Sequence, residues 1–190
     1  MAIHFNIQES SNLKGVFVIT PNVSTDLRGN IYTSFLSEQI DALLPNSANL
    51  KFKHDKFSHS HQNVLRGIHG DSKTYKLVTC VYGEILQVVV DCRTESLSYL
   101  QHEKFHIHYQ NPKLILIPPN MGNAYFVHSK EAIYHYKLAY TGEYFDADAQ
   151  FSLAFDDARI GIDWELNGAT PILSNRDLKA FQTNQKEHLC

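Results

Sequence analysis

The chain has 190 residues, of which 43% are hydrophobic, and a formal net charge of −3. A chain of this length fits one domain, residues 1–190, with a sizeable core. The acidic balance argues against a general nucleic-acid binder, which would carry a basic surplus.

The N-terminus, the apolar runs and the cysteines indicate the cellular compartment. The N-terminus has no basic and apolar leader, and no apolar run reaches the roughly 18 residues of a membrane span. The three cysteines are odd in number and lack metal-ligand spacing, which fits a reducing compartment. We therefore expect a cytoplasmic protein with no membrane or nucleic-acid partner.

Short apolar and β-branched runs recur along the chain, with Gly, Pro, Asn and Asp between them, which is typical of strands and turns. The predicted strands are Leu13–Ile19, Ile31–Leu36, Leu50–Phe57, Tyr75–Val81, Ile85–Val90, Leu114–Ile117, Ala124–Val127 and Ile133–Leu138. Many short strands of this kind predict an all-β sandwich or barrel.

Helical periodicity occurs in only two places. Glu38–Leu44 has Ser37 as a candidate N-cap and Pro45 as a stop, and Ser174–Phe181 begins with Ser174 as a candidate cap. We predict a small β-barrel with a few short peripheral helices.

The segment Asn63–Gly70 and the two strands that follow it combine apolar runs with basic residues, tyrosines and a histidine. Buried polar groups cost free energy unless they are paired, so this pattern predicts a site inside the barrel. His69 is a candidate general base, because its ordinary pKa of about 6.5 suits proton transfer at neutral pH. A structural histidine is the alternative. A regular pleat would put Arg66 on the opposite strand face from His69, although Gly67 and Gly70 indicate bends.

Two further patterns are ambiguous on the residues alone. His59 and His61 have the spacing of a metal-binding pair, but Asn123 stands where a metal histidine would be expected, so we predict no metal. Tyr134 and Tyr136 share one strand face, with His135 on the other, and this is consistent with a site or with ordinary strand packing.

Eight landmarks in this order resemble the dTDP-4-dehydrorhamnose 3,5-epimerase family of cupin-fold sugar epimerases, over most of the chain. They are Asp26–Gly29, Val64–His69, Lys76–Val78, Gly83–Arg93, Leu116–Pro119, Tyr136–Lys137, Gly161–Trp164 and Leu173–Asp177. The resemblance implies a cupin-type jelly-roll barrel. It is closer still to the branch that acts on GDP-linked 4-keto-heptoses in bacterial capsule synthesis.

The resemblance also implies roles for individual residues. The catalytic set would be the base His69, its orienting carboxylate Asp177, the acid Tyr136 and Lys76 near the substrate carbonyl. The substrate-binding set would be Arg28, Arg66, Asn123 and Tyr134, with the arginines on the diphosphate and Arg28 reaching across a dimer. Asn123 replaces a histidine of the family, which indicates a different sugar or nucleotide.

The expected function is therefore inversion of C3, of C5 or of both in a 4-keto nucleotide sugar, with a GDP-linked heptose favoured. It would need no cofactor, and the resemblance implies a homodimer. The alternatives are a dTDP-4-dehydrorhamnose 3,5-epimerase proper, a 3,4-ketoisomerase or a non-catalytic sugar-binding cupin. The N-terminal segment Ala2–Ile19 has the apolar spacing to join a partner's sheet or to pair within its own chain.

Overall fold

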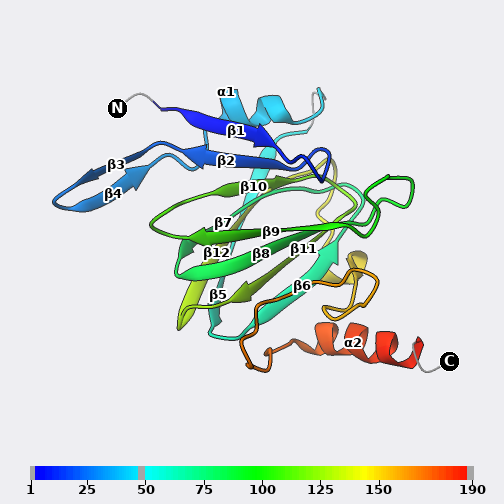
Figure 1. Cartoon of the computed structure of the whole chain (residues 1–190). Helices are drawn as coiled ribbons and strands as arrows, with labels where there is room; N and C mark the ends of the chain where they lie inside the picture. Colours follow the sequence, from blue (N-terminus) through cyan, green and yellow to red (C-terminus); the bar gives the residue numbers. More distant parts are fainter. Residues whose placement is uncertain (1–2, 47–49, 188–190) are drawn as a thin grey trace.

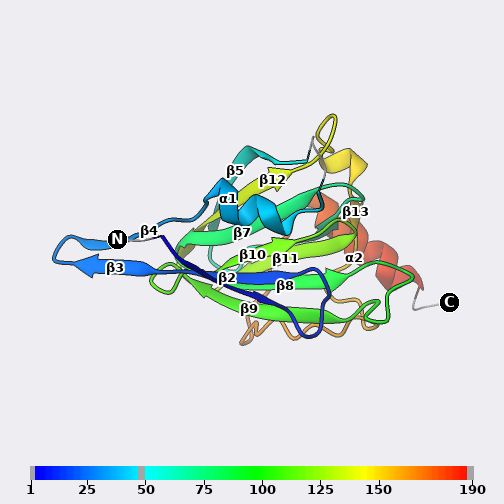
Figure 2. The same cartoon turned by 90° about the horizontal axis from the view of Figure 1, so that it is seen from above.

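Two antiparallel β-sheets lie face to face in the structure, a computed structural model that describes residues 3–46 and 50–187 (Figure 1, Figure 2). The strand order is β1-β2-β10-β7-β12-β5 in the larger sheet and β13-β6-β11-β8-β9 in the smaller one. This confirms the predicted all-β barrel with short peripheral helices. Within the described residues, no helix is long and apolar enough to span a membrane.

The six-stranded sheet contains β1 (Phe5–Glu9), β2 (Phe17–Pro21), β5 (Phe52–His61), β7 (Tyr75–Tyr82), β10 (Leu114–Ile117) and β12 (Glu131–Ala139). The five-stranded sheet contains β6 (Leu65–Gly70), β8 (Glu84–Asp91), β9 (His102–His108), β11 (Met121–Val127) and β13 (Phe151–Ser152). A hairpin of β3 (Val23–Asp26) and β4 (Gly29–Tyr32) extends away from both sheets (Figure 1). The helical segments are α1 (Ser37–Ile40), α2 (Asn175–Glu187) and two 3-10 turns, Asp41–Leu43 and Ala147–Ala149.

Both faces of the central strands are buried, which explains why they read as continuous apolar runs. In β8, Ile85 and Val89 point into the core between the sheets, whereas Leu86 and Val88 pack outward against the chain around Trp164. The outer face of the larger sheet is covered in the same way by α1 and the residues that follow it. A strand covered on both sides needs apolar residues at successive positions, because each side chain contributes about 25 cal/mol per Å² of apolar surface buried.

The predicted strands all contain observed strand, and three of them lose residues at one end. Residues 13–16 precede β2 in a turn in which Leu13 and Val16 are buried, residues 33–36 lie outside β4, and β5 begins at Phe52 instead of Leu50. Several strands escaped prediction, and β9 shows the reason. Its only apolar residues are Phe105 and Ile107, because its other face is polar, so the run is too short to stand out.

The two predicted helices are present with different ends. The first is a single turn of α1 followed by a 3-10 turn, and Leu36 rather than Ser37 occupies the N-cap position, without a side-chain cap. The second helix extends further than predicted, to Glu187. Ser174 does cap it, because the Ser174 hydroxyl accepts a hydrogen bond from the backbone N–H of Asp177 at 3.2 Å.

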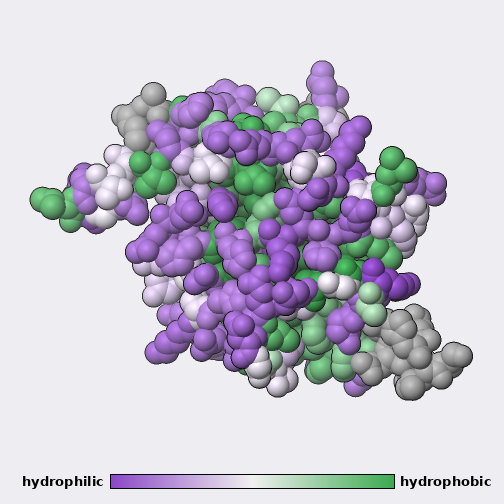
Figure 3. Space-filling model, in the orientation of Figure 1, coloured by the Kyte–Doolittle hydropathy of each residue, from purple (hydrophilic) through white to green (hydrophobic). Residues whose placement is uncertain are grey.

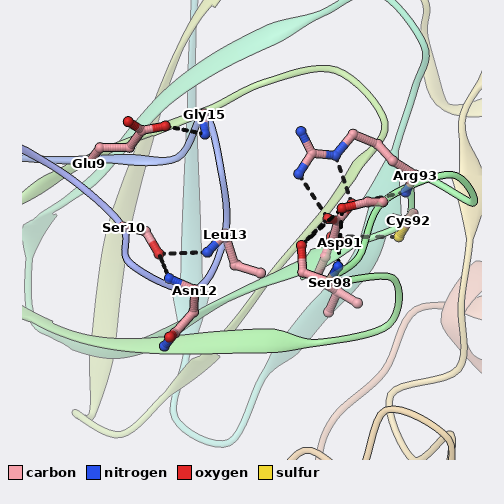
Figure 4. Close-up of polar contacts among 11 residues, drawn as sticks. Glu9, Ser10, Asn12, Leu13, Gly15, Asp91, Cys92, Arg93 and Ser98 are labelled. Carbon is pink, nitrogen blue, oxygen red and sulfur yellow. Dashed lines mark hydrogen bonds and ion pairs between the residues drawn. The ribbon is translucent and has the colours of Figure 1, made fainter.

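Two loops at one end of the sheets are closed by local polar contacts (Figure 4). After β8, the buried Asp91 carboxylate accepts two hydrogen bonds from the Arg93 guanidinium, both at 2.8 Å, and one from the Ser98 hydroxyl. Burial opposes ionisation of Asp91, but these hydrogen bonds outweigh it and lower its pKa. Between β1 and β2, the Ser10 hydroxyl accepts from the backbone N–H of Leu13. The Asp91–Arg93 end of the Gly83–Arg93 landmark therefore has a structural role.

A β-bulge in β6 corrects the expected orientation of Arg66. Asn123 of β11 lies opposite His69, and Tyr125 lies opposite Arg66, so three steps along β6 match two along β11. The extra residue turns Arg66 to the same interior face as His69, where both line one cavity. Gly67 makes the bulge possible. It has φ +127°, and a Cβ there would lie 2.4 Å from the Cβ of Ala124.

Replacing Gly67 with alanine should therefore lower the free energy of unfolding by about 3 kcal/mol, through the backbone strain and the clash together. Gly142→Ala is the matched control, since Gly142 also has positive φ (+65°), but a Cβ there would have no neighbouring atom within 4 Å. It should cost only about 1–2 kcal/mol. Urea unfolding measures both values, and equal losses would contradict the role of the close approach.

Candidate active site

A cavity of about 310 Å³ opens at one end of the barrel, between the two sheets. Strands β6 and β11 of one sheet and β5, β7 and β12 of the other contribute to its wall, and the start of α2 closes one side. Its polar lining includes Lys56, Ser58, Arg66, His69, Lys76, Asn123, Tyr136, Tyr144, Arg176 and Asp177. The predicted catalytic residues are thus brought together, and the prediction of polar groups inside the barrel is confirmed.

His69 and Asp177 form a hydrogen-bonded pair in this cavity. The Nε2 atom of His69 lies 2.6 Å from Oδ1 of Asp177, and Oδ2 of the same carboxylate accepts a hydrogen bond from the Ser174 hydroxyl at 2.7 Å. Because an ionised carboxylate only accepts hydrogen bonds, the proton of the neutral imidazole belongs on Nε2. Nδ1 is then left with a lone pair, so the pair fixes both the tautomer and the direction of the ring.

The charge of Asp177 is maintained by its partners. The side chain is only 3% exposed, and burial by itself would raise its pKa. The hydrogen bonds from His69 and Ser174 outweigh that effect, so the pKa of Asp177 is lowered from its ordinary value. Asp177 therefore remains a carboxylate through the neutral range, as an orienting group must.

Lys76 is a buried cation whose ammonium N–H groups have no hydrogen-bond partner among the described residues. Its side chain is 7% exposed, and its Nζ atom lies 3.5 Å from Oδ2 of Asp71, a long contact for a hydrogen bond. Asp71 is held in place by the backbone N–H groups of Lys73 and Thr74, which donate to its other oxygen. Burial lowers the pKa of Lys76, and the Asp71 charge partly offsets this. An ammonium in this setting is suited to stabilising negative charge on a bound oxygen.

Tyr136 faces the cavity from the sheet opposite His69. Its ring packs edge-on against Tyr134, with 4.6 Å between the ring centroids. Burial raises the pKa of the Tyr136 phenol, as does the nearby Tyr125, although Arg66 and a hydrogen bond with Ser58 oppose the shift. The phenol therefore keeps its proton at neutral pH. A protonated phenol and an oriented imidazole on opposite walls can exchange protons with the two faces of one carbon atom.

The two predicted phosphate-binding arginines lie far apart in the chain's own structure. Arg66 lines the cavity, and its Nε atom donates to the Ser60 hydroxyl at 3.0 Å. Arg28 lies in the turn of the β3–β4 hairpin, is 89% exposed and pairs with Asp26. It therefore does not reach the cavity of its own chain.

Tyr134 does not line the cavity, unlike Asn123. Its side chain is completely buried behind the wall, in the core between the sheets. Its hydroxyl donates to Gln87 and lies 3.2 Å from Oδ1 of Asn123. No surface of this ring is accessible, so the structure gives no support to a direct contact of Tyr134 with substrate, which stays a prediction. The predicted strand faces are confirmed, since His135 points outward and pairs with Asp55.

Several residues at the cavity were missing from the predicted set, among them Lys56, Tyr144 and Arg176. Lys56 of β5 places its Nζ atom 3.1 Å from the hydroxyl of Tyr144, and Arg176 of α2 donates through Nε to the Ser152 hydroxyl at 2.6 Å. Arg176 stands next to Asp177 in the sequence, so the landmark that identified the carboxylate also contained this second signal.

The His59 and His61 pair lies at the end of β5. The rings are 5.5 Å apart, and His59 pairs with Glu131 at 2.9 Å. Across residues 3–46 and 50–187, no group of three or more His, Cys, Asp or Glu side chains is arranged to hold a metal ion.

A family model for dTDP-4-dehydrorhamnose 3,5-epimerase matches residues 10–185. The chain belongs to this epimerase family. The dTDP-4-dehydrorhamnose 3,5-epimerases of Escherichia coli K12 and Methanothermobacter thermautotrophicus are 30% and 32% identical to it, over 92% and 88% of the chain and 93% and 89% of their own lengths.

Solved structures of other sugar epimerases have the same fold as this chain. A Legionella pneumophila dTDP-6-deoxy-D-glucose-3,5-epimerase in complex with dTDP-4-keto-L-rhamnose superposes with a TM-score of 0.83 at 31% identity, covering 93% of this chain and 92% of that one. A 4-keto-6-deoxy sugar epimerase of Streptomyces spheroides gives a TM-score of 0.83 at 27% identity, covering 98% and 92%. The cupin-type jelly roll is thereby confirmed.

Asp177→Asn should lower kcat by at least about 100-fold, because the amide no longer holds the imidazole in the required tautomer. It should also alter the pH dependence of stability. The charged form of Asp177 stabilises the fold above the ordinary aspartate pKa of 3.8, and this contribution is lost as the pH falls through the lower folded pKa.

Urea unfolding from about pH 6 to about pH 3 measures the second effect. The gap in unfolding free energy between wild type and Asp177→Asn should shrink as the pH falls. A gap that stays constant over this range would contradict the ionised pair.

Proposed function

We propose that this protein is a nucleotide-sugar epimerase that inverts carbon centres next to the C4 ketone of a 4-keto sugar. The observation that carries the proposal is the His69–Asp177 pair on one wall of a cavity whose opposite wall presents the protonated phenol of Tyr136. Membership of the epimerase family supports the same reaction class.

The chemistry follows from the acidity of a carbon next to a ketone. His69 takes the proton through Nδ1, the C–H bond breaks, and its electron pair becomes an enolate with the charge on the C4 oxygen. Lys76 donates hydrogen bonds to this oxygen, a type of stabilisation often worth a few kcal/mol. As the carbonyl re-forms, the phenol of Tyr136 gives its proton to the carbon from the other face. The centre is inverted, and solvent restores both groups.

We propose a dTDP-linked 4-keto-6-deoxy sugar as the substrate. The expectation of a GDP-linked heptose for capsule synthesis gains no support from the relatives described above, whose names refer to dTDP-linked or 4-keto-6-deoxy sugars. The diphosphate would be met by Arg66, together with Lys56 and Arg176, which also line the cavity. A small basic cluster of this kind lets a chain of net charge −3 bind an anion.

Deuterium exchange tests the reaction directly. Wild-type protein in D2O should exchange the C3 proton, the C5 proton or both of dTDP-4-keto-L-rhamnose for deuterium, and NMR measures the loss of each proton signal. A GDP-linked 4-keto sugar should react more slowly. His69→Asn should reduce exchange at least about 100-fold, whereas Tyr136→Phe should still exchange protons but lose inversion. His59→Asn, on the outer face of β5, is the matched control and should behave as wild type.

The same experiment separates the alternatives. A 3,4-ketoisomerase would give a product with its carbonyl moved to C3, and a sugar-binding cupin would bind the nucleotide sugar without exchanging protons. Near-normal exchange in His69→Asn would contradict the assignment of the base.

We also propose that the protein forms a homodimer through the β3–β4 hairpin, with Arg28 reaching the partner's cavity. The hairpin extends from the barrel and carries exposed apolar side chains near its tip, Leu27 at 108% and Ile31 at 70% (Figure 3). The N-terminal strand β1 instead pairs with β2 of its own chain. A cytoplasmic location and a single domain over residues 1–190 stay predictions.

Light scattering should give a mass of twice 21.7 kDa. The variant with Leu27→Asp and Ile31→Asp should shift the protein toward monomer, because charges on a buried interface are costly. Leu97→Asp is the control, since Leu97 is as exposed (105%) but lies in the loop after β8. A monomeric wild type, or equal effects of the two variants, would overturn the dimer.

A further inference from the structure

A hydrogen-bond network of buried amide and hydroxyl groups lies behind the cavity wall. The Gln87 side chain nitrogen donates to the backbone carbonyl of Val88 at 3.0 Å and to Oδ1 of Asn123 at 2.7 Å. The Tyr134 hydroxyl donates to Oε1 of Gln87, and it also lies 3.2 Å from Oδ1 of Asn123. Gln87 and Tyr134 are completely buried, and Asn123 is 7% exposed where it lines the cavity. Gln87 and Tyr134 lie outside the catalytic set described above.

The donors and acceptors of this hydrogen-bond network can be assigned in only one consistent way. A backbone carbonyl can only accept, so the carbonyl of Val88 requires the nitrogen of Gln87 to point toward it. The oxygen of Gln87 must then face the Tyr134 hydroxyl, and its nitrogen must face the oxygen of Asn123. Oδ1 of Asn123 therefore accepts from the Gln87 nitrogen, and the group that Asn123 offers to the cavity is its Nδ2 amino group.

The position of Asn123 decides what that donor can contact. Asn123 of β11 is the direct cross-strand partner of His69 of β6, and both side chains line the cavity. Directly opposed residues have Cβ atoms about 5 Å apart, so a donor on Asn123 reaches the atoms beside the carbon on which His69 acts.

We propose that Gln87 and Tyr134 are positioning residues that hold Asn123 as a hydrogen-bond donor to a sugar oxygen adjacent to the reacting carbon. The inference rests on the proposed epimerase function and adds a determinant of its specificity. Because neither a carboxamide nor the backbone carbonyl titrates, this contact selects for an acceptor oxygen at all working pH values. A sugar without an oxygen at that position would leave the donor unpaired and bind poorly.

A double-mutant cycle tests whether Gln87 acts through Asn123. Gln87→Met keeps the side chain length but removes all three hydrogen bonds of the amide. With dTDP-4-keto-L-rhamnose in D2O, Gln87→Met should lower kcat/KM for exchange about 10-fold, and Asn123→Ala about 10-fold or more. In the Asn123→Ala background, Gln87→Met should cost less than about 2-fold, because there is no amide left to orient.

Tyr134→Phe provides a second and milder variant, since it removes only the hydroxyl. It should lower kcat/KM less than Gln87→Met does, and its effect should also disappear in the Asn123→Ala background. A purely structural role would instead lower the melting temperature and reduce kcat/KM by the same factor in both backgrounds, which would overturn the inference.

The wild-type protein separates this inference from the function on which it rests. If wild type exchanges protons but the cycle shows no coupling, the positioning role alone is wrong. If wild type neither binds nor exchanges dTDP-4-keto-L-rhamnose or a GDP-linked 4-keto sugar, the proposed function fails, and the inference fails with it.

Discussion

The hydrogen bond between His69 and Asp177 joins two residues that are 108 positions apart, and the geometry of the site depends on it. One partner lies next to the end of strand β6, and the other lies in the first turn of the C-terminal helix. Ser174 caps the helix and also holds the carboxylate, so the helix start and the orientation of the base are set by one local arrangement. Folding of the C-terminal segment onto the barrel and assembly of the base are therefore the same event.

The double-sided burial of the sheets explains why the site lies where it does. Between the sheets the space is filled by apolar side chains, and on the outside both sheets are covered by other parts of the chain. Polar side chains lie at the barrel end, where His69, Lys76 and Tyr136 surround a cavity, or pair with one another inside the barrel, as Gln87 and Tyr134 do. Most buried polar groups of the site thus have a hydrogen-bond partner, and the Lys76 ammonium, which has none among the described residues, lines the cavity where a bound oxygen can accept from it.

Local strand and turn patterns predicted the fold class, and the family resemblance supplied the predicted residues that line the cavity, which are Arg66, His69, Lys76, Asn123, Tyr136 and Asp177. Prediction from the sequence failed where the answer depended on two strands at once. The facing of Arg66 is set by a bulge opposite β11, and a pleat rule applied to one strand cannot detect it. Tyr134 and Tyr136 lie on the same face of β12. Tyr134 is buried in the core because it lies deeper in the barrel, whereas Tyr136 forms part of the cavity wall. Arg176 and Lys56 reach the cavity through tertiary packing, and neither belongs to a periodic pattern that would single it out.

The cavity has two kinds of wall, and this division has a consequence for how such proteins diverge. The base, the acid and the lysine come from strands in the middle of the two sheets, where any change disturbs packing on both faces. Tyr144 and Gln150 come from the connection between β12 and β13. This connection pairs with neither sheet and contains one 3-10 turn, Ala147–Ala149. Mutations in that connection can alter which nucleotide or sugar is admitted while the proton-transfer groups stay in place. Substrate range and reaction chemistry can therefore evolve at separate rates within one barrel.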